Sequence, residues 1–170
     1  SDVYQDLFLE GSYTGKGIVW LSVCSSAPGK QGYFEGDELI DRIKYKQTSA
    51  TAYLVDAEGT VGKTYEAKTT PHMYIVNPEG VLVYAGGIDN IASSNKDDIG
   101  KATNYVREAL DAALAGKEIV VKGSKPYGCS AGYFLRSGPS SQKLRRDELV
   151  EFVRAAAQVE FERIERPDFI

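Results

Sequence analysis

The sequence is short of the residues on which metal and redox chemistry depend, because its 170 residues include two cysteines and one histidine. Two thiols and one imidazole cannot complete a closed four-ligand zinc site within one chain, so we expect no metal and no cofactor. Cys24 and Cys129 are too far apart in the sequence for a C-x-x-C pair. They could form one disulfide or be two buried thiols.

Long apolar runs are also absent. No stretch reaches the roughly 18–20 residues that a helix needs to cross a bilayer, and no signal peptide is visible. We therefore predict a soluble protein with no membrane partner. The chain begins with Ser1 and not with Met, which keeps an exported origin open.

Charge of one sign does not dominate, since 20 basic and 24 acidic residues give a net charge of −4. The one dense basic cluster contains Lys143, Arg145 and Arg146, and Asp147 and Glu148 follow it directly. We therefore predict no nucleic-acid surface. The glycines lack both phosphate-loop spacings, and no serine stands in a G-x-S-x-G context, so nucleotide binding and serine hydrolysis are also unsupported.

The apolar residues that are present predict an α/β domain. Gly17–Val23 is a nearly continuous apolar run, typical of a strand buried on both faces. Ala52–Val55 predicts a second buried strand parallel to it. Asn77–Gly80 is a tight-turn sequence that joins the β-rich runs Met73–Val76 and Val81–Tyr84 into an antiparallel hairpin.

Helices are expected between these strands. A helical turn at Asp2–Leu9 precedes a turn-rich break from Gly11 to Gly17, and the other helices are predicted at Asp37–Lys46, Thr60–Tyr65 and Thr103–Ala115. Ile91–Gly100 reads as a polar loop. Parallel strands followed by an antiparallel hairpin indicate an α/β fold with a mixed sheet.

The C-terminal part of the chain differs from the rest. We predict one domain at 1–133 and a separate segment at 134–170, which consists of a linker and a charged amphipathic helix from Arg145 to about Arg166. This helix could bind a partner or a second copy of the chain. The alternative is that it packs on its own domain.

Several strings together resemble bacterial redoxins of the alkyl hydroperoxide reductase/thiol-specific antioxidant group, within the thioredoxin superfamily. The strings are Gly17–Tyr33, Lys68–Met73, Leu82–Asp89 and Lys125–Cys129, and the resemblance covers about Val3 to Tyr133. It implies a thioredoxin-like three-layer sandwich, in the bacterial cytoplasm or periplasm. In that family a strand and a helix come before the part that corresponds to Ser1, and the redox cysteine begins that helix.

The resemblance therefore implies a thioredoxin-like domain without its first β-α unit and with an added C-terminal helix. In the family the missing strand is central in the sheet. Its absence would leave unpaired edges on the strands Ile18–Val23 and Met73–Val76, and unpaired edges invite strand pairing. We therefore expect a homodimer.

The resemblance also suggests site residues. It implies a cis bond before Pro71, and in relatives the backbone beside this proline pairs with an extended substrate, so Thr70, Pro71 and His72 are candidates for binding a protein or peptide. Cys24 could be a relocated thiol or a small buried residue. Cys129 could be a resolving cysteine, a disulfide partner of Cys24 or a structural residue in a turn. His72 could be a base for a thiol or an ordinary polar residue.

Three hypotheses about function follow. The first is a divergent redoxin that has lost the standard redox cysteine motif and acts as a self-associating binding or structural module. The second is a thiol-disulfide oxidoreductase or peroxidase that uses Cys24 and Cys129. The third is a fragment whose catalytic half lies upstream of Ser1.

Overall fold

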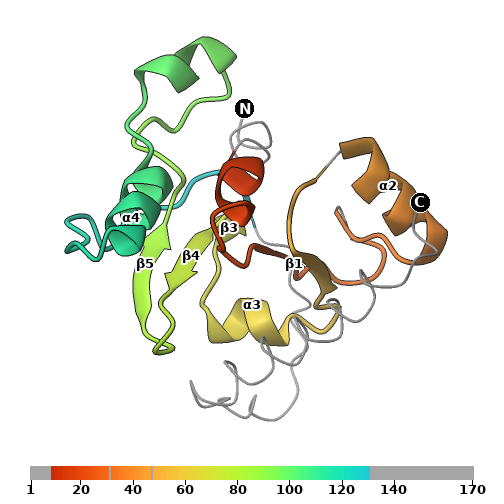
Figure 1. Ribbon diagram of the computed structural model, residues 1–170. Coiled ribbons are helices and arrows are strands. Elements are labelled where there is room, and N and C mark those ends of the chain that lie inside the picture. Colours follow the sequence, from red (N-terminus) through yellow and green to blue (C-terminus); the bar gives the residue numbers. More distant parts are fainter. Residues whose placement is uncertain (1–8, 31, 47, 131–170) are drawn as a thin grey trace. The chain divides into compact units, whose positions relative to one another are not determined.

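The computed structural model describes residues 9–30, 32–46 and 48–130 (Figure 1). They fall into two compact units: residues 10–66 form one, and residues 67–130 with Leu9 form the other. The predicted helical turn at Asp2–Leu9, apart from its last residue, and the predicted segment 134–170 lie outside the described residues. Within the described part of the chain, no helix is long and apolar enough to span a membrane.

The unit of residues 10–66 is built on two parallel strands. Strand β1, Leu21–Cys24, pairs with β2, Ala52–Val55, in a register that sets Leu21 opposite Ala52. Helix α2, Gly36–Lys46, forms the crossover between them, and α3, Thr60–Thr64, follows β2. The predicted bounds of the second strand and the parallel pairing are thus confirmed, but its predicted burial is wrong, because Ala52 is buried while Val55 is 41% exposed.

The prediction that Gly17–Val23 is a strand buried on both faces is wrong. The strand begins only at Leu21, and the side chains of Val19 and Val23 are 53% and 40% exposed. Helix α2 contains no buried residue, so it does not provide the close cover that strands buried on both faces require.

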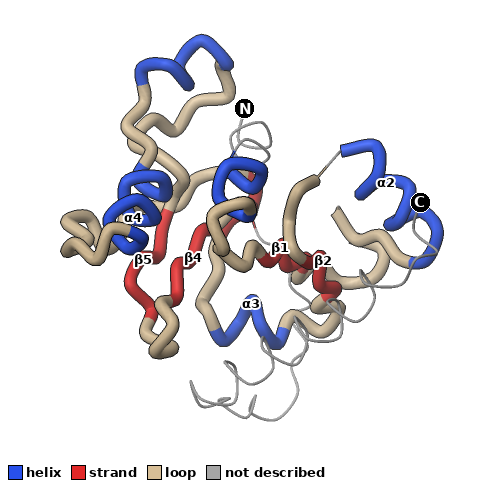
Figure 2. Tube along the Cα trace, in the orientation of Figure 1, coloured by secondary structure: helices blue, strands red, loops and turns tan. Residues whose placement is uncertain are grey.

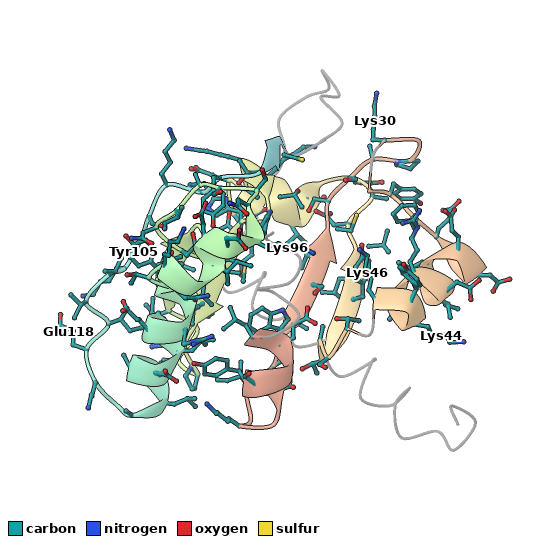
Figure 3. The ribbon with its side chains drawn as sticks, turned by 90° about the horizontal axis from the view of Figure 1, so that it is seen from above. Lys30, Lys44, Lys46, Lys96, Tyr105 and Glu118 are labelled. Carbon is teal, nitrogen blue, oxygen red and sulfur yellow. The ribbon has the colours of Figure 1, made fainter. Side chains whose placement is uncertain are left out.

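Helix α2 follows its sequence signals closely. Asp37 and Glu38 lie in its first turn, and Lys44 and Lys46 lie in its last, so both ends carry charges that favour the helix dipole. Figure 3 shows Lys44 and Lys46 on this helix and Lys30 extending from the loop before it. This helix is therefore held mainly by local interactions and not by a buried face.

Residues 9–14 are helical, although the sequence predicts a break from Gly11 onward. The side chain of Glu10 explains the difference, because it is 4% exposed and accepts three hydrogen bonds. Ser22 Oγ donates to Oε1 at 3.3 Å, while Thr48 Oγ1 and the Ser49 N–H donate to Oε2 at 2.6 and 3.0 Å. These long-range bonds fix the helix despite the low helix propensity of glycine.

The second unit is built on an antiparallel hairpin, as predicted. Strands β4, Met73–Val76, and β5, Leu82–Gly86, pair from Met73 opposite Gly86 to Val76 opposite Leu82 (Figure 2). In the turn, Gly80 N–H donates to the Asn77 carbonyl oxygen at 2.9 Å, and Val81 N–H donates to Asn77 Oδ1 at 2.7 Å.

Helix α4, Tyr105–Leu114, packs against β4 and confirms the predicted helix. The Asn104 side chain caps it by accepting from Arg107 N–H at 2.8 Å, and Gly116, with φ of 65°, follows its end. The apolar stripe Val106, Ala109 and Leu110 is buried together with Tyr84 and Ile88, and these residues form most of this unit's core.

Two short segments complete this unit. Strand β3, Thr69–Thr70, pairs antiparallel with β6, Cys129–Ser130. The 3-10 helix η1, Lys96–Lys101, overlaps the second half of the predicted polar loop at Ile91–Gly100, and Asn95 caps it by accepting from Asp97 N–H. The described part of the chain is therefore a mixed α/β structure with one parallel and two antiparallel strand pairs.

Candidate functional site

The turn at Pro71 connects β3 to β4. The Thr70–Pro71 peptide bond is cis, as the resemblance implies. Thr69 Oγ1 donates a hydrogen bond to the Pro71 carbonyl oxygen at 2.9 Å. Thr70 is exposed, and Pro71 and His72 are partly exposed, so this turn presents a surface on which another chain could bind.

His72 is held inside the turn by its own neighbours. The Lys68 N–H donates to Nδ1 at 3.2 Å, and the Tyr74 hydroxyl lies 2.8 Å from the same nitrogen. Partial burial, and then the positive charge of Lys68, lower the pKa of His72. The ring is therefore neutral at neutral pH, and its acceptor nitrogen is already engaged, which favours a structural role over that of a base.

This arrangement predicts a pH dependence of stability. Folding lowers the pKa of His72, so protons bind the unfolded chain more readily than the folded one. The free energy of unfolding is therefore highest above the unfolded pKa of about 6.5, and it decreases as the pH falls from that value towards the lower pKa of the folded state. Urea unfolding between pH 7.5 and 5 should show wild type losing stability relative to His72→Asn. Asparagine keeps an acceptor oxygen but does not titrate. A constant difference across this range would contradict the prediction.

Cys129 lies beside the proline turn, because its Cα is paired with that of Thr70 across the β3–β6 ladder. Its side chain is exposed and its thiol is free. The preceding residue must be glycine: Gly128 has φ of 134°, and a Cβ there would overlap the Thr70 carbonyl oxygen and lie 3.3 Å from Pro71 Cδ. The structure thus brings Cys129, Thr70 and Pro71 together.

Residues 122–130, which we call the Cys129 strap, run alongside the end of β5. Ala85 N–H donates to the Lys122 carbonyl oxygen, and Ser124 N–H donates to the Ala85 carbonyl oxygen, both at 3.2 Å. A Cβ at Gly86 would lie 2.5–2.6 Å from atoms of Ser124. Gly86 therefore allows the strap to approach the strand closely.

Side chains lock the same contact. The Ser124 hydroxyl accepts from Gly87 N–H at 3.0 Å and lies 2.8 Å from the hydroxyl of Tyr84. Burial raises the pKa of Tyr84, although its hydrogen bond with Ser124 acts in the opposite direction. The protonated hydroxyl donates to the Gly87 carbonyl oxygen at 2.6 Å. Tyr127 extends the anchor by donating to Asp89 Oδ1 at 2.5 Å.

Cys24 belongs to the other unit, where it ends β1. It is partly exposed and free, and its Sγ donates to the Gly32 carbonyl oxygen at 3.2 Å. Burial, with a further contribution from a hydrogen bond to Cys24, raises the pKa of Tyr53. Cys24 is thus neither a fully buried residue nor a freely accessible thiol.

Near Cys24, the Tyr33 hydroxyl donates to Glu35 at 2.5 Å, and this hydrogen bond is the main cause that raises the pKa of Tyr33.

Ser25 and Asp56 follow the two parallel strands at the same edge as Cys24. Ser25 Oγ and the Gly62 N–H both donate to Asp56 Oδ2, at 2.7 and 3.0 Å. These bonds join the end of β1 to α3, which is a structural role. Among the described residues, no group of three or more His, Cys, Asp and Glu side chains could hold a metal ion.

The two thiols should differ in reactivity. We expect Cys129 to react with an aromatic disulfide reagent about tenfold faster than Cys24, because Cys129 is exposed while Cys24 is partly covered and hydrogen-bonded. Stopped-flow measurements on Cys24→Ser and Cys129→Ser assign the two rates. Equal rates, or a faster Cys24, would contradict this prediction.

Sequence reasoning missed three features: the hydrogen bonds of Glu10, the bond between Asp89 and Tyr127, and the close approach of the strap to Gly86. The Glu10 bonds and the Asp89–Tyr127 bond join residues that are distant in the sequence, and no local pattern marks them. The pair Gly86–Gly87 was a usable signal, because consecutive glycines at the end of a strand often mark a close backbone approach.

Comparison with known proteins shows a shared fold and no stated activity. No protein-family model matches the chain, and no curated protein matches it. A hypothetical protein, SMc02350, from Sinorhizobium meliloti 1021 is 26% identical with a TM-score of 0.66, over 79% of this chain and 71% of that one. An uncharacterized conserved protein from Geobacillus kaustophilus is also 26% identical with a TM-score of 0.67, over 82% of this chain and 70% of that one.

Proposed function

We propose that this chain is a divergent thioredoxin-like protein of the alkyl hydroperoxide reductase/thiol-specific antioxidant group that acts as a non-catalytic binding module. The order of its elements supports the proposal, because a parallel β-α-β unit is followed by an antiparallel hairpin and a helix. The position of Pro71, between β3 and the first strand of that hairpin, is also the one that the resemblance implies. The three-layer arrangement around a single mixed sheet is part of the proposal.

One observation carries the binding role. The backbone of Thr69 and Thr70 already pairs with an extended antiparallel segment, which is the strap end Cys129–Ser130. An edge that accepts a strand from its own chain has the geometry to accept one from a partner. The support for a catalytic role of the two thiols is weaker, because the sequence has no C-x-x-C pair and the acceptor nitrogen of His72 already has hydrogen-bond partners.

A peptide selection tests the binding face, defined as Thr70, Pro71 and His72. Random peptides displayed on phage would be selected against wild type, and Thr70→Lys should weaken the selected peptides about tenfold because a long charged side chain replaces an exposed small one at the edge. Thr103→Lys is the matched control, since Thr103 is also exposed in the same unit. Failure to enrich any peptide, or equal weakening by both variants, would refute the binding role.

Self-association is the second part of the proposal. Among the strands that the structure describes, β1 pairs with β2 alone and β4 with β5 alone, while the strap pairs with the other edge of β5 at Ala85. Strands β1, β2 and β4 therefore each have one edge without a ladder partner among the described residues. Open strand edges favour pairing between copies. Light scattering should give twice the chain mass of 18.6 kDa, and a clean monomer at micromolar concentration would count against the dimer.

A thiol-disulfide oxidoreductase that uses Cys24 and Cys129 is the alternative, and the exposure of Cys129 beside Pro71 favours it. In this reaction the two thiols give up two electrons and two protons and form one S–S bond, while the O–O bond of hydrogen peroxide breaks and the peroxide takes up these electrons and protons to give two molecules of water. Thiol titration before and after hydrogen peroxide tests it. Loss of both thiols to one disulfide within a chain would establish the alternative, and two retained thiols would remove it.

A further inference from the structure

We propose that the Cys129 strap competes with partner strands for the backbone of Thr69–Thr70. A partner strand would pair with these residues only after Cys129–Ser130 has left β3. The inference rests on the proposed function and adds its regulation. The juxtaposition that carries it is the pairing of Thr69 with Ser130 and of Thr70 with Cys129.

Occupancy of the edge is the first step. Strand β3 is two residues long, and both residues pair with the strap. Backbone groups that pair with the strap cannot also pair with a second strand approaching from the same side. Binding of an extended partner segment on that side of β3 and docking of the strap end therefore exclude each other.

The described segments of the strap before and after Gly128 are held by bonds of different number and kind, which is the second step. Residues 122–127 are fixed to the hairpin by backbone bonds at Ala85 and by the hydroxyl groups of Ser124, Tyr84 and Tyr127. The end at Cys129–Ser130 is held by a ladder of two residue pairs, and the Cys129 side chain is exposed. Short exposed ladders open at low free-energy cost, while anchored segments stay closed.

Gly128 stands between the anchored part and the ladder. With φ of 134° it adopts a backbone conformation that other residues rarely reach, and its missing side chain lets the strap end pass the Thr70 carbonyl. Rotation at this residue can move residues 129–130 off β3 without disturbing the Tyr127–Asp89 bond. Within the described residues, the strap therefore combines a firmly bonded segment, 122–127, with a weakly bonded segment, 129–130.

A reversible disulfide between the strap and β3, which we call the lock, tests whether the strap competes with a partner strand. In a Cys24→Ser background, Thr70→Cys places a thiol opposite Cys129, because Cα atoms that face each other in antiparallel strands lie about 4.5–5.5 Å apart, within disulfide range. The probe is a fluorescein-labelled peptide with the sequence of residues 124–130, in which serine replaces Cys129. Fluorescence anisotropy measures its binding to the oxidised and the reduced protein.

We expect the reduced protein to bind the peptide at least about tenfold more tightly than the oxidised protein, in which the strap end cannot leave the edge. Gly128→Ala, which cannot dock its strap end, should bind it more tightly than wild type. The same lock variant with Cys129→Ser cannot form the disulfide and should show no redox dependence. Equal binding by the oxidised and reduced forms, or no binding even by Gly128→Ala, would overturn the proposal.

This result is separable from the peptide selection. If the strap peptide shows the redox dependence while no unrelated peptide is enriched, the strap competes as proposed and the binding module is wrong. If unrelated peptides bind at Thr70 equally well in the locked and unlocked states, the module is supported and the competition is wrong.

Discussion

Replacing Gly86 with alanine is expected to destabilise the protein by about 2–3 kcal/mol, at the upper end of the cost of overpacking. The new Cβ would lie 2.5 Å from Ser124 Oγ and 2.6 Å from the backbone N and O of the same residue. Backbone atoms cannot rotate away as a flexible side chain can, so the whole strap must shift. Urea unfolding followed by far-ultraviolet circular dichroism measures the loss, because Trp20, the only tryptophan, belongs to the other unit.

Gly100→Ala is the matched control in the same unit. A Cβ at Gly100 would have nothing within 4 Å, and this residue lies in η1. Its free energy of unfolding should change by less than about 0.5 kcal/mol. If both substitutions cost the same, the close approach of the strap to β5 is not what requires glycine at position 86.

Removing the Glu10 side chain should have an effect of similar size or larger, about 3–4 kcal/mol. Hydrogen bonds to a charged group contribute about 1.5–3 kcal/mol each, and the three donors to Glu10 would partly find water instead. Glu10→Ala would leave the Ser49 N–H, now bonded at 3.0 Å, without its acceptor. Trp20 belongs to this unit, and its backbone N–H donates to Thr51 Oγ1 at 3.0 Å close to the same strands, so its fluorescence should follow the unfolding.

Two further variants interpret the result. Glu10→Gln keeps the shape and one acceptor oxygen but presents an NH₂ group to three donors, so we expect an intermediate loss. Glu58→Ala removes an exposed acid from the same unit and should change stability little. A Glu10→Ala protein as stable as Glu58→Ala would show that the buried carboxylate does not hold the helix at residues 9–14.

The parts of the fold that sequence predicts are those with local causes. The hairpin turn depends on Asn77 and Gly80, and helix α4 depends on the Asn104 cap and its own apolar stripe, so short windows of sequence suffice. The helix at residues 9–14 and the exposure of Val23 escaped prediction. The helix depends on hydrogen bonds that Glu10 accepts from residues that are remote in the sequence. The exposure of Val23 depends on how little a remote segment, helix α2, covers the strand.

The candidate site shows the same division. Pro71 and Cys129 were found through a resemblance in short strings, and their closeness to each other is a property of the fold. It requires the passage of Gly128 past Thr70 and the bond between Tyr127 and Asp89, whose positions differ by 38 residues. No periodicity or turn signal encodes a contact of that kind.

The close contact between β5 and the strap also constrains which substitutions this protein can accept. A Cβ at position 86 would meet the backbone N and O of Ser124 at 2.6 Å as well as its Oγ at 2.5 Å, so a smaller side chain at position 124 cannot make room for it. Ser124→Gly, harmful alone because it removes the hydroxyl that joins Tyr84 and Gly87, should therefore not restore the stability lost in Gly86→Ala. Related chains are accordingly expected to keep glycine at position 86 whichever residue they carry at position 124.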